Sequence, residues 1–217
     1  MVMSYHLCWA QWIDKGYKGF VTNRIPGGIP FPELSWSTWF GWVGVEIFFV
    51  LSGFVIAYSG EGSTPFGFAR SRMLRLYPAA WICASITAAA SLSLNLGSPR
   101  ELLRPWLASI TLYPIKPWID GSYWTLGIEI SFYTVIFFLL ALRRFHLLEA
   151  VTLIIGSVSS AYWILGALFA DQFLFAHGSS TMLRLLLVRY GCFFAVGTLT
   201  YVISRRGISP TRLAAAT

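Results

Sequence analysis

Two glutamates stand in stretches of the chain that are otherwise apolar enough to cross a membrane. Glu129 lies within the run 122–133, and Glu46 lies near the start of an earlier apolar run. A charged side chain at the centre of a bilayer costs at least about 2.5 kcal/mol, so such residues usually face a bundle interior or a water-filled cavity. Both glutamates are therefore candidate functional residues. For Glu129 the alternative is a buried structural acid that locks two helices together.

Hydroxyl-bearing residues accompany Glu129 on one side of the expected helix. At helical spacing Ser122, Thr125, Glu129 and Tyr133 form one stripe, whereas most of the neighbouring aromatic and branched side chains lie elsewhere. These neighbouring hydroxyl groups favour a functional role for the Glu129 carboxylate.

One histidine and several arginines could also carry chemistry. His6, in the first apolar segment, is either a satisfied core residue or a general base with a tunable pKa. The cluster Arg70, Arg72 and Arg75 either binds anionic headgroups and fixes topology, or recognises a phosphorylated donor through bidentate contacts. Arg189, in the last apolar segment, is either a buried functional charge or the partner of an acid.

The composition is that of a helical membrane protein. The chain has 217 residues, of which 56% are hydrophobic and 12% charged, whereas a soluble domain carries about 25% charged residues. The net charge of +7 comes from sparse Lys and Arg in loops, which fits membrane topology better than nucleic-acid binding. Cys8, Cys83 and Cys192 lack zinc-type spacing, so we expect packing cysteines and no metal site.

Six apolar segments predict an all-α, polytopic transmembrane helix bundle. They cover residues 1–13, 39–59, 76–96, 122–142, 147–170 and 182–204. The first is too short to span a bilayer, because about 20 residues are needed. We therefore expect about five complete membrane helices plus a partial first one. Loops are expected at 14–38, 60–75 and 97–121, with Pro78 in the first turn of its helix.

The distribution of arginines predicts the orientation in the membrane. Positive charge is denser in the 60–75 loop, the Arg143-Arg144 turn and the C-terminal tail, which places them in the cytoplasm. Glu129 then lies in the outer half of its helix. We expect one membrane domain over residues 1–204, followed by a short cytoplasmic tail, 205–217.

Three motifs resemble the signatures of the acyltransferase-3 family of membrane O-acyltransferases. The string from Gly44 to Phe54 (GVEIFFVLSGF) looks like the family's second-helix signature. The string from Phe68 to Pro78, with Arg72-x-x-Arg75, looks like the basic loop after it. Residues 124–133 resemble Trp-Ser-Leu-x-x-Glu-x-x-Phe-Tyr, with Thr125 in place of Ser. The motifs occur in the family's order over residues 41–133, and a weaker resemblance continues through 193–197 to about 204.

The resemblance implies transfer of an acyl group, often acetyl, from acyl-CoA to a hydroxyl of a carbohydrate or lipid-linked sugar. It implies His6 as the general base that activates this hydroxyl, with Glu129 orienting His6 or binding the acceptor. Arg70, Arg72 and Arg75 would meet the phosphates of CoA, and Trp124, Tyr133 and Glu46 would contact the acceptor. The implied location is the bacterial cytoplasmic membrane, in contact with membrane lipids.

The chain also departs from the family pattern. The family's first helix carries an Arg ten residues before the histidine that His6 matches, and that position would precede Met1. The family has about ten membrane helices, and only about five fit here. We therefore expect a chain clipped at both ends. Two alternatives stay open: an inactive remnant of such an enzyme, and a non-enzymatic transporter or export component, which would predict internal repeats.

Overall fold

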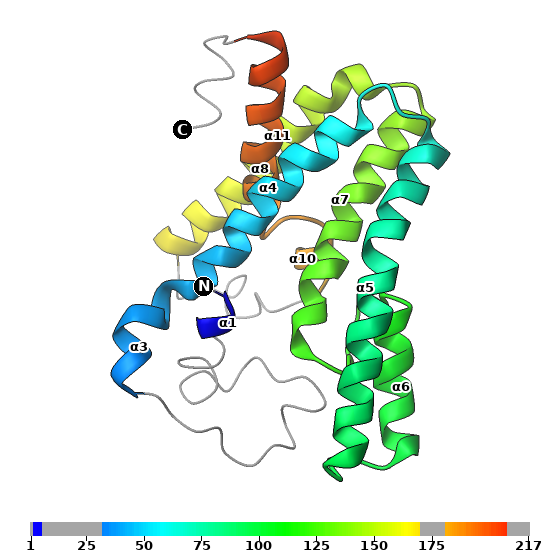
Figure 1. The fold of residues 1–217 in the computed structure, drawn as a ribbon. Helices are drawn as coiled ribbons and strands as arrows, with labels where there is room; N and C mark the ends of the chain where they lie inside the picture. Colours follow the sequence, from blue (N-terminus) through cyan, green and yellow to red (C-terminus); the bar gives the residue numbers. More distant parts are fainter. Residues whose placement is uncertain (1, 6–31, 170–180, 208–217) are drawn as a thin grey trace. The chain divides into compact units, whose positions relative to one another are not determined.

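The computed structural model describes residues 2–5, 32–169 and 181–207 (Figure 1). Throughout these residues the regular secondary structure is helical and no strand occurs, which confirms the all-α prediction. The helices are α1 (Val2–Tyr5), α3 (Pro32–Thr38), α4 (Val43–Gly60), α5 (Pro65–Ser93), α6 (Pro99–Ile110), α7 (Trp124–Ala141), α8 (Leu148–Leu168), α10 (Thr181–Leu185) and α11 (Gly191–Arg206), with 3-10 turns η3 (Trp39–Trp42), η4 (Gly121–Tyr123) and η5 (Phe145–Leu147).

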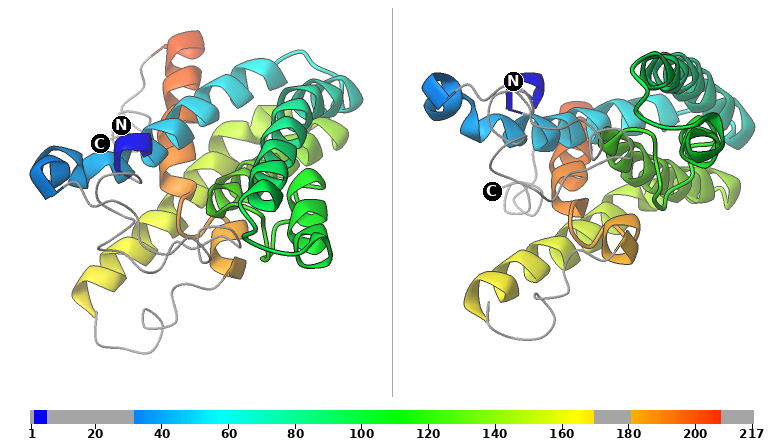
Figure 2. Two further views of the ribbon diagram at one scale, coloured as in Figure 1. Left: turned by 60° about the horizontal axis from the view of Figure 1, so that its bottom comes forward. Right: turned by 90° about the horizontal axis from the view of Figure 1, so that it is seen from below.

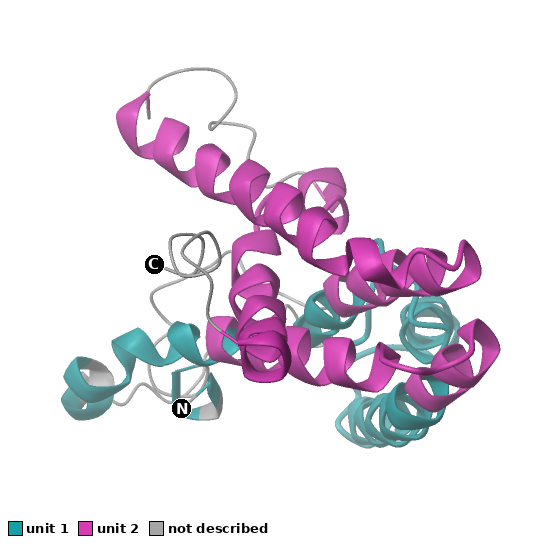
Figure 3. Cartoon of the chain, turned by 90° about the horizontal axis from the view of Figure 1, so that it is seen from above, with its two compact units in different colours: residues 1–45, 73–127 teal, residues 46–72, 128–217 magenta. Residues whose placement is uncertain are grey.

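The chain divides into two compact units (Figure 3). Unit 1 comprises residues 1–45 and 73–127, and unit 2 comprises residues 46–72 and 128–217. Helices α4, α5 and α7 each have residues in both units. The first eight residues of α5 and most of α4 and α7 therefore belong to unit 2, together with α8, α10 and α11.

Four helical stretches in the described residues are long and apolar enough to cross a membrane. They are Trp36–Gly60, Pro65–Ser93, Gly121–Ala141 and Phe145–Leu168. Each is longer than the roughly 20 residues that a bilayer requires. The prediction of an integral membrane protein with a helix bundle is confirmed.

Helix α5 begins much earlier than the sequence analysis predicted. The stretch 65–75, expected as part of a loop, is helical from Pro65 onward, and Pro78 lies in the interior of α5 instead of its first turn. Pro65 is compatible with a first helical position, and the Ala, Arg, Met and Leu residues that follow are strong helix formers. A proline inside the helix is tolerated because membrane helices find other partners for the freed carbonyl.

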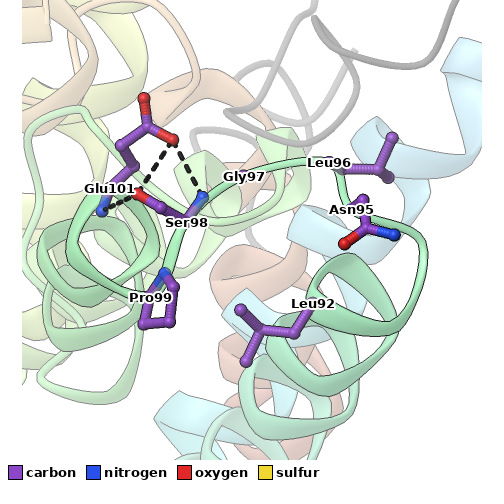
Figure 4. A pocket seen from close by; sticks show the side chains of 7 residues that line it. All are labelled: Leu92, Asn95, Leu96, Gly97, Ser98, Pro99 and Glu101. Carbon is purple, nitrogen blue, oxygen red and sulfur yellow. Dashed lines mark hydrogen bonds between the residues drawn. The ribbon is translucent and has the colours of Figure 1, made fainter.

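Unit 1 contains a helix, α6, inside the stretch 97–121 that was predicted to be a loop. Ser98 and Glu101 form a capping box at its start: the Ser98 Oγ accepts a bond from the Glu101 backbone N–H, and Glu101 Oε2 accepts from the Ser98 N–H at 2.9 Å. These two residues stand at one edge of a hollow between the end of α5 and the start of α6 (Figure 4). The Ser-x-x-Glu spacing was visible in the sequence and predicts this helix.

Helix α6 runs beside the second half of α5 (Figures 1 and 2). Trp81 Nε1 on α5 donates to the Ile110 carbonyl at 2.9 Å, and Trp106 Nε1 on α6 donates to Ser85 Oγ at 3.3 Å. Indole N–H groups, one from each helix, thus join α5 and α6. Farther along, the Tyr123 hydroxyl donates to the Ala80 carbonyl at 2.8 Å and ties η4 to α5.

The single helix predicted over residues 182–204 is wrong, because the segment breaks into α10 and α11. Residues 186–190 form turns, and Leu187 has a φ of 61°. The break is supported from outside the segment: Trp163 Nε1 donates to the Arg189 carbonyl at 2.8 Å. Because a backbone carbonyl without a partner is unfavourable in a membrane, this bond helps to explain why an apolar segment can leave the helical path here.

Two glycines allow α11 to approach α4 very closely within unit 2. A Cβ atom on Gly53 would collide with the Phe194 carbonyl oxygen, and one on Gly197 would collide with the Val50 carbonyl oxygen. The Thr198 hydroxyl donates to the Gly53 carbonyl at 3.3 Å across the same contact. Small residues at a helix crossing are typical of membrane proteins, where close backbone packing drives association.

Aromatic side chains fill the space beside this crossing. The Phe194 ring stacks on Phe132 of α7 at 4.7 Å between centroids and lies 5.0 Å from the Phe49 ring of α4. On its other side α11 packs against α8 (Figure 2). Helices α4, α7 and α11 therefore share one core, and this core fixes the position of Glu129 on α7.

Candidate functional site

Glu129 is a buried carboxylate that accepts two hydroxyl hydrogen bonds. It lies on α7 with 1% of its surface exposed. The Tyr133 hydroxyl, one turn farther along α7, donates to Oε1 at 2.6 Å, and the Ser52 hydroxyl of α4 donates to the same oxygen at 3.4 Å. Both bonds reach Oε1, so the second carboxylate oxygen is left for a partner other than these two hydroxyls.

The adjacent residues Ser52 and Gly53 have two different roles in the structure. Gly53 faces α11 and makes the close backbone contact there, whereas Ser52 is 4% exposed and points its hydroxyl toward Glu129. Successive helix positions differ by about 100°, so neighbours in the chain face different helices. The small-residue packing role belongs to Gly53, and the polar role belongs to Ser52.

Tyr133 connects the carboxylate to an arginine through its ring. The Arg72 guanidinium carbon lies 5.8 Å from the Tyr133 ring centroid and 5.7 Å from that of Phe68. The two rings meet edge to face, with centroids 6.2 Å apart. A guanidinium within about 6 Å of an aromatic face is attracted by the ring electrons, more strongly when the site is dry.

Arg72 is buried with part of its hydrogen-bonding capacity unused. It is 9% exposed, and its Nη2 donates to Ser71 Oγ at 3.4 Å. Among the residues that the structure describes, neither Nε nor Nη1 has a hydrogen-bond acceptor. Because a buried cation without acceptors is costly, these two nitrogens point to an anionic ligand, and Arg fits phosphate or carboxylate oxygens in pairs.

We call Ser52, Phe68, Arg72, Glu129 and Tyr133 the Glu129 site. All five belong to unit 2. The sequence predicted Glu129, Tyr133 and Arg72 as site residues, but Ser52 and Phe68 were not predicted. Only its place in the basic motif, one turn before Arg72, could have indicated Phe68.

The other expected site residues are placed as follows. Arg70 is exposed on α5, and Glu46 is partly buried near the start of α4. Arg75 is exposed and Trp124 is buried, and both belong to unit 1. His6 lies outside the described residues, so its role as a base stays a prediction. Within the described parts of the chain, no cluster of His, Cys, Asp and Glu could hold a metal ion.

The comparison with protein families decides what kind of protein this is. The family model described as an acyltransferase domain, acyltransferase 3, matches residues 1–215. The chain belongs to the acyltransferase-3 family. Neither a curated protein nor a solved structure showed a significant match to it. The protein is therefore a membrane acyltransferase in its general class, as the three motifs predicted.

The three acyltransferase-3 motifs meet at the Glu129 site. The second-helix motif supplies Ser52, the basic motif supplies Phe68 and Arg72, and the third supplies Glu129 and Tyr133. Motifs that lie far apart in the chain thus contribute adjacent side chains to one buried cluster. In this acyltransferase the motifs are a structural unit as well as a sequence pattern.

A second polar cluster in unit 2 lies just beyond the membrane helices. Glu61, in the turn after α4, accepts hydrogen bonds at Oε2 from the Tyr201 hydroxyl and from Arg205 Nε and Nη2, the latter two at 3.1 and 3.0 Å. We call Glu61, Tyr201 and Arg205 the Glu61 cluster. The bonds from Tyr201 and Arg205 lower the pKa of Glu61 below its usual value of 4.5. The cluster ties the α4–α5 turn to the end of α11.

Proposed function

We infer that this protein transfers an acyl group from acyl-CoA to a hydroxyl of a carbohydrate or glycosylated acceptor. One observation carries the proposal: a buried carboxylate, positioned by two hydroxyls, lies near a buried arginine whose Nε and Nη1 lack acceptors among the described residues. The first feature suits activation of a hydroxyl, and the second suits a donor with anionic groups. Membership of the acyltransferase-3 family supports the reaction class.

The donor is assigned to the basic segment of α5. Arg72 is buried, and its Nε and Nη1 have no acceptor among the described residues, so both can donate to a ligand. Arg70 and Arg75 are exposed on the same helix. Coenzyme A carries several phosphate oxygens, which arginines bind in pairs of hydrogen bonds. We assign CoA phosphates to these three side chains.

The acceptor is assigned to the neighbourhood of Glu129. A general base, for which His6 is our candidate, takes the proton of the acceptor hydroxyl as its oxygen attacks the thioester carbonyl. The carbon–sulfur bond then breaks, and the CoA thiolate leaves and takes up a proton. Glu129 orients the base or the acceptor hydroxyl, and Glu46 and Trp124 are assigned to acceptor contacts. Positioned acid–base catalysis of this kind contributes about 10²–10⁴-fold.

The surrounding membrane is assigned as the bacterial cytoplasmic membrane. The arginines of the first turns of α5 and of the C-terminal tail would face the cytoplasm, in keeping with the positive-inside rule. The donor would then arrive from the cytoplasm. A protease-accessibility assay on sealed, oriented vesicles, with a cleavage sequence inserted after Arg206, tests this orientation.

The experiment that tests the function measures transfer of radiolabelled acetyl from acetyl-CoA to candidate glycans, with the chain reconstituted in phospholipid vesicles. Wild-type protein should label an acceptor, and Glu129→Gln should lower kcat by about 100-fold or more. Glu33→Gln, at an exposed position on α3, is the matched control and should keep wild-type kcat. Unchanged transfer in Glu129→Gln would refute the role of Glu129. Absence of any labelled acceptor would favour the inactive-remnant alternative.

A further inference from the structure

We propose that Tyr133 is a positioning residue that couples occupation of Arg72 by the donor to the orientation of Glu129. The inference rests on the proposed function, since it assigns the donor to Arg72 and the chemistry to Glu129. Tyr133 touches both residues with different parts of one side chain. Its ring packs against the guanidinium, and its hydroxyl bonds the carboxylate.

The ring of Tyr133 is held between two neighbours and is 7% exposed. Phe68 meets it edge to face, and the Arg72 guanidinium carbon lies 5.8 Å from its centroid. These contacts leave the ring little surface on which a sugar could stack. A positioning role therefore explains the buried ring better than the acceptor contact expected from the sequence.

The hydroxyl of Tyr133 fixes the carboxylate together with Ser52. Both hydroxyls donate to Oε1, from α7 and from α4, so the plane of the carboxylate is held from two helices. Holding Oε1 also sets the direction of the second oxygen, which neither hydroxyl occupies. Supporting hydrogen bonds of this kind keep a functional group in its productive geometry.

Donor binding is coupled to Glu129 because Nε and Nη1 of Arg72 have no acceptor among the described residues. An anion at Nε and Nη1 would draw the guanidinium toward itself and change its contact with the Tyr133 ring. Packed interiors transmit such shifts, because no free volume absorbs them. The hydroxyl of Tyr133 is rigidly attached to that ring, so a movement of the ring also moves the hydrogen bond that holds Oε1 of Glu129. Donor binding would thereby set the carboxylate for transfer.

Two substitutions at position 133 separate the ring from the hydroxyl. Tyr133→Phe keeps the ring and should lower kcat about 10-fold or more, because a bond to a charged group is lost, while coenzyme A affinity stays within about 2-fold. Tyr133→Leu loses both parts and should lower kcat similarly and also weaken coenzyme A binding by about 2- to 10-fold. Affinity is measured by calorimetry with coenzyme A alone, and kcat by acetyl transfer.

A second pair of variants tests the carboxylate side. Ser52→Ala should lower kcat, Ser52→Thr should restore most of it by returning a hydroxyl, and neither should change coenzyme A affinity. In the double variant Ser52→Ala/Tyr133→Phe, the factor by which kcat falls should differ from the product of the two single factors, because both hydroxyls act through Oε1. A factor equal to that product would contradict the shared role. The matched control is Tyr58→Phe, which removes a hydroxyl at an exposed position of α4 and should leave both measurements unchanged.

The outcomes distinguish this inference from the function on which it rests. Wild-type protein that neither binds coenzyme A nor transfers acetyl overturns both. Wild-type protein that does both, with Tyr133→Phe at wild-type kcat, overturns the coupling alone. Tyr133→Phe that loses coenzyme A binding as strongly as Tyr133→Leu also overturns it. A thermal melt checks folding, and if Tyr133→Leu is unfolded, the kcat and affinity of Tyr133→Phe decide.

Discussion

The Glu129 site and the Glu61 cluster each contain a carboxylate that accepts a hydrogen bond from a tyrosine. The two carboxylates differ in burial and in the charge of their other partners. Glu61 has a side chain that is 43% exposed, and Arg205 neutralises it directly. Glu129 is 1% exposed and accepts bonds from neutral hydroxyls, and within the described residues no Lys or Arg forms an ion pair with it. The nearby buried arginine, Arg72, instead contacts aromatic rings.

This difference distinguishes a structural contact, at Glu61, from a site at Glu129 whose buried acid and cation do not pair with each other. At Glu61 the charges satisfy each other and join the α4–α5 turn to α11. At Glu129 an acid and a cation lie in one buried cluster without pairing, which is unfavourable for stability alone. An ionisable residue within a membrane helix is by default a candidate functional residue.

The largest expected effect comes from removing each charge in turn. Glu129→Gln should lower kcat for acyl transfer by about 100-fold or more, whereas Glu61→Gln should stay within about 2-fold of wild type. The comparison is made by acetyl transfer in vesicles at matched protein amounts. Equal losses in the two variants would mean that Glu129 and Glu61 do not differ in their contribution to acyl transfer.

The next effect concerns the packing that supports the Glu129 site. Gly53→Ala should destabilise the protein by about 1–3 kcal/mol and also reduce kcat, because its Cβ would push α4 away from α11 and shift Ser52. The control is Gly62→Ala, beside Glu61, where φ is +69° and no atom lies near the added Cβ. It should cost about 1 kcal/mol of backbone strain and leave kcat unchanged. Thermal unfolding and acetyl transfer measure the two effects.

A smaller effect should distinguish the two arginines. Arg72→Gln should raise KM for acetyl-CoA about 10-fold without lowering the melting temperature, because it removes a buried charge whose Nε and Nη1 lack acceptors among the described residues. Arg205→Gln should leave KM unchanged and lower the melting temperature, because it removes the partner of Glu61. Arg144→Gln, in an exposed turn, is the control for both measurements. A lower melting temperature in Arg72→Gln would indicate a structural role for Arg72.

The smallest effect is a pH dependence of stability at the Glu61 cluster. The folded-state pKa of Glu61 is below its usual value of 4.5, so its contribution is present above that pH. It is lost as the pH falls through the lowered folded-state pKa. The melting temperature of wild type should therefore fall more steeply below pH 4.5 than that of Glu61→Gln. Parallel curves for the two proteins would contradict the contribution of Glu61.

The sequence predicted features that depend on local spacing and composition. The length of the apolar runs predicted membrane helices, and the four-residue spacing of Glu129 and Tyr133 placed both side chains on one face, where they are bonded. The capping box at Ser98 and Glu101 also predicts a helix, although we had expected a loop there. Local patterns of this kind act within one or two helical turns.

Features that depend on distant partners could not be predicted in this way. Ser52 and Glu129 are bonded across 77 positions of the chain. The break between α10 and α11 relies on Trp163, which lies on another helix and leaves no mark in the segment that breaks. Tyr133, one of the two aromatic residues beside Arg72, comes from another helix, α7. The role of His6 stays a prediction.

The order of the dipeptide Ser52-Gly53 carries information that its composition does not. Gly53 is the position at which α11 admits no side chain, and Ser52 is the position that faces Glu129. A chain with the two residues exchanged would have the same mass, charge and hydropathy. A serine side chain at position 53 would collide with the Phe194 carbonyl oxygen. A glycine at position 52 would remove the hydroxyl that donates to Glu129. In this acyltransferase the order of two neighbouring small residues therefore decides which one faces α11 and which one faces Glu129.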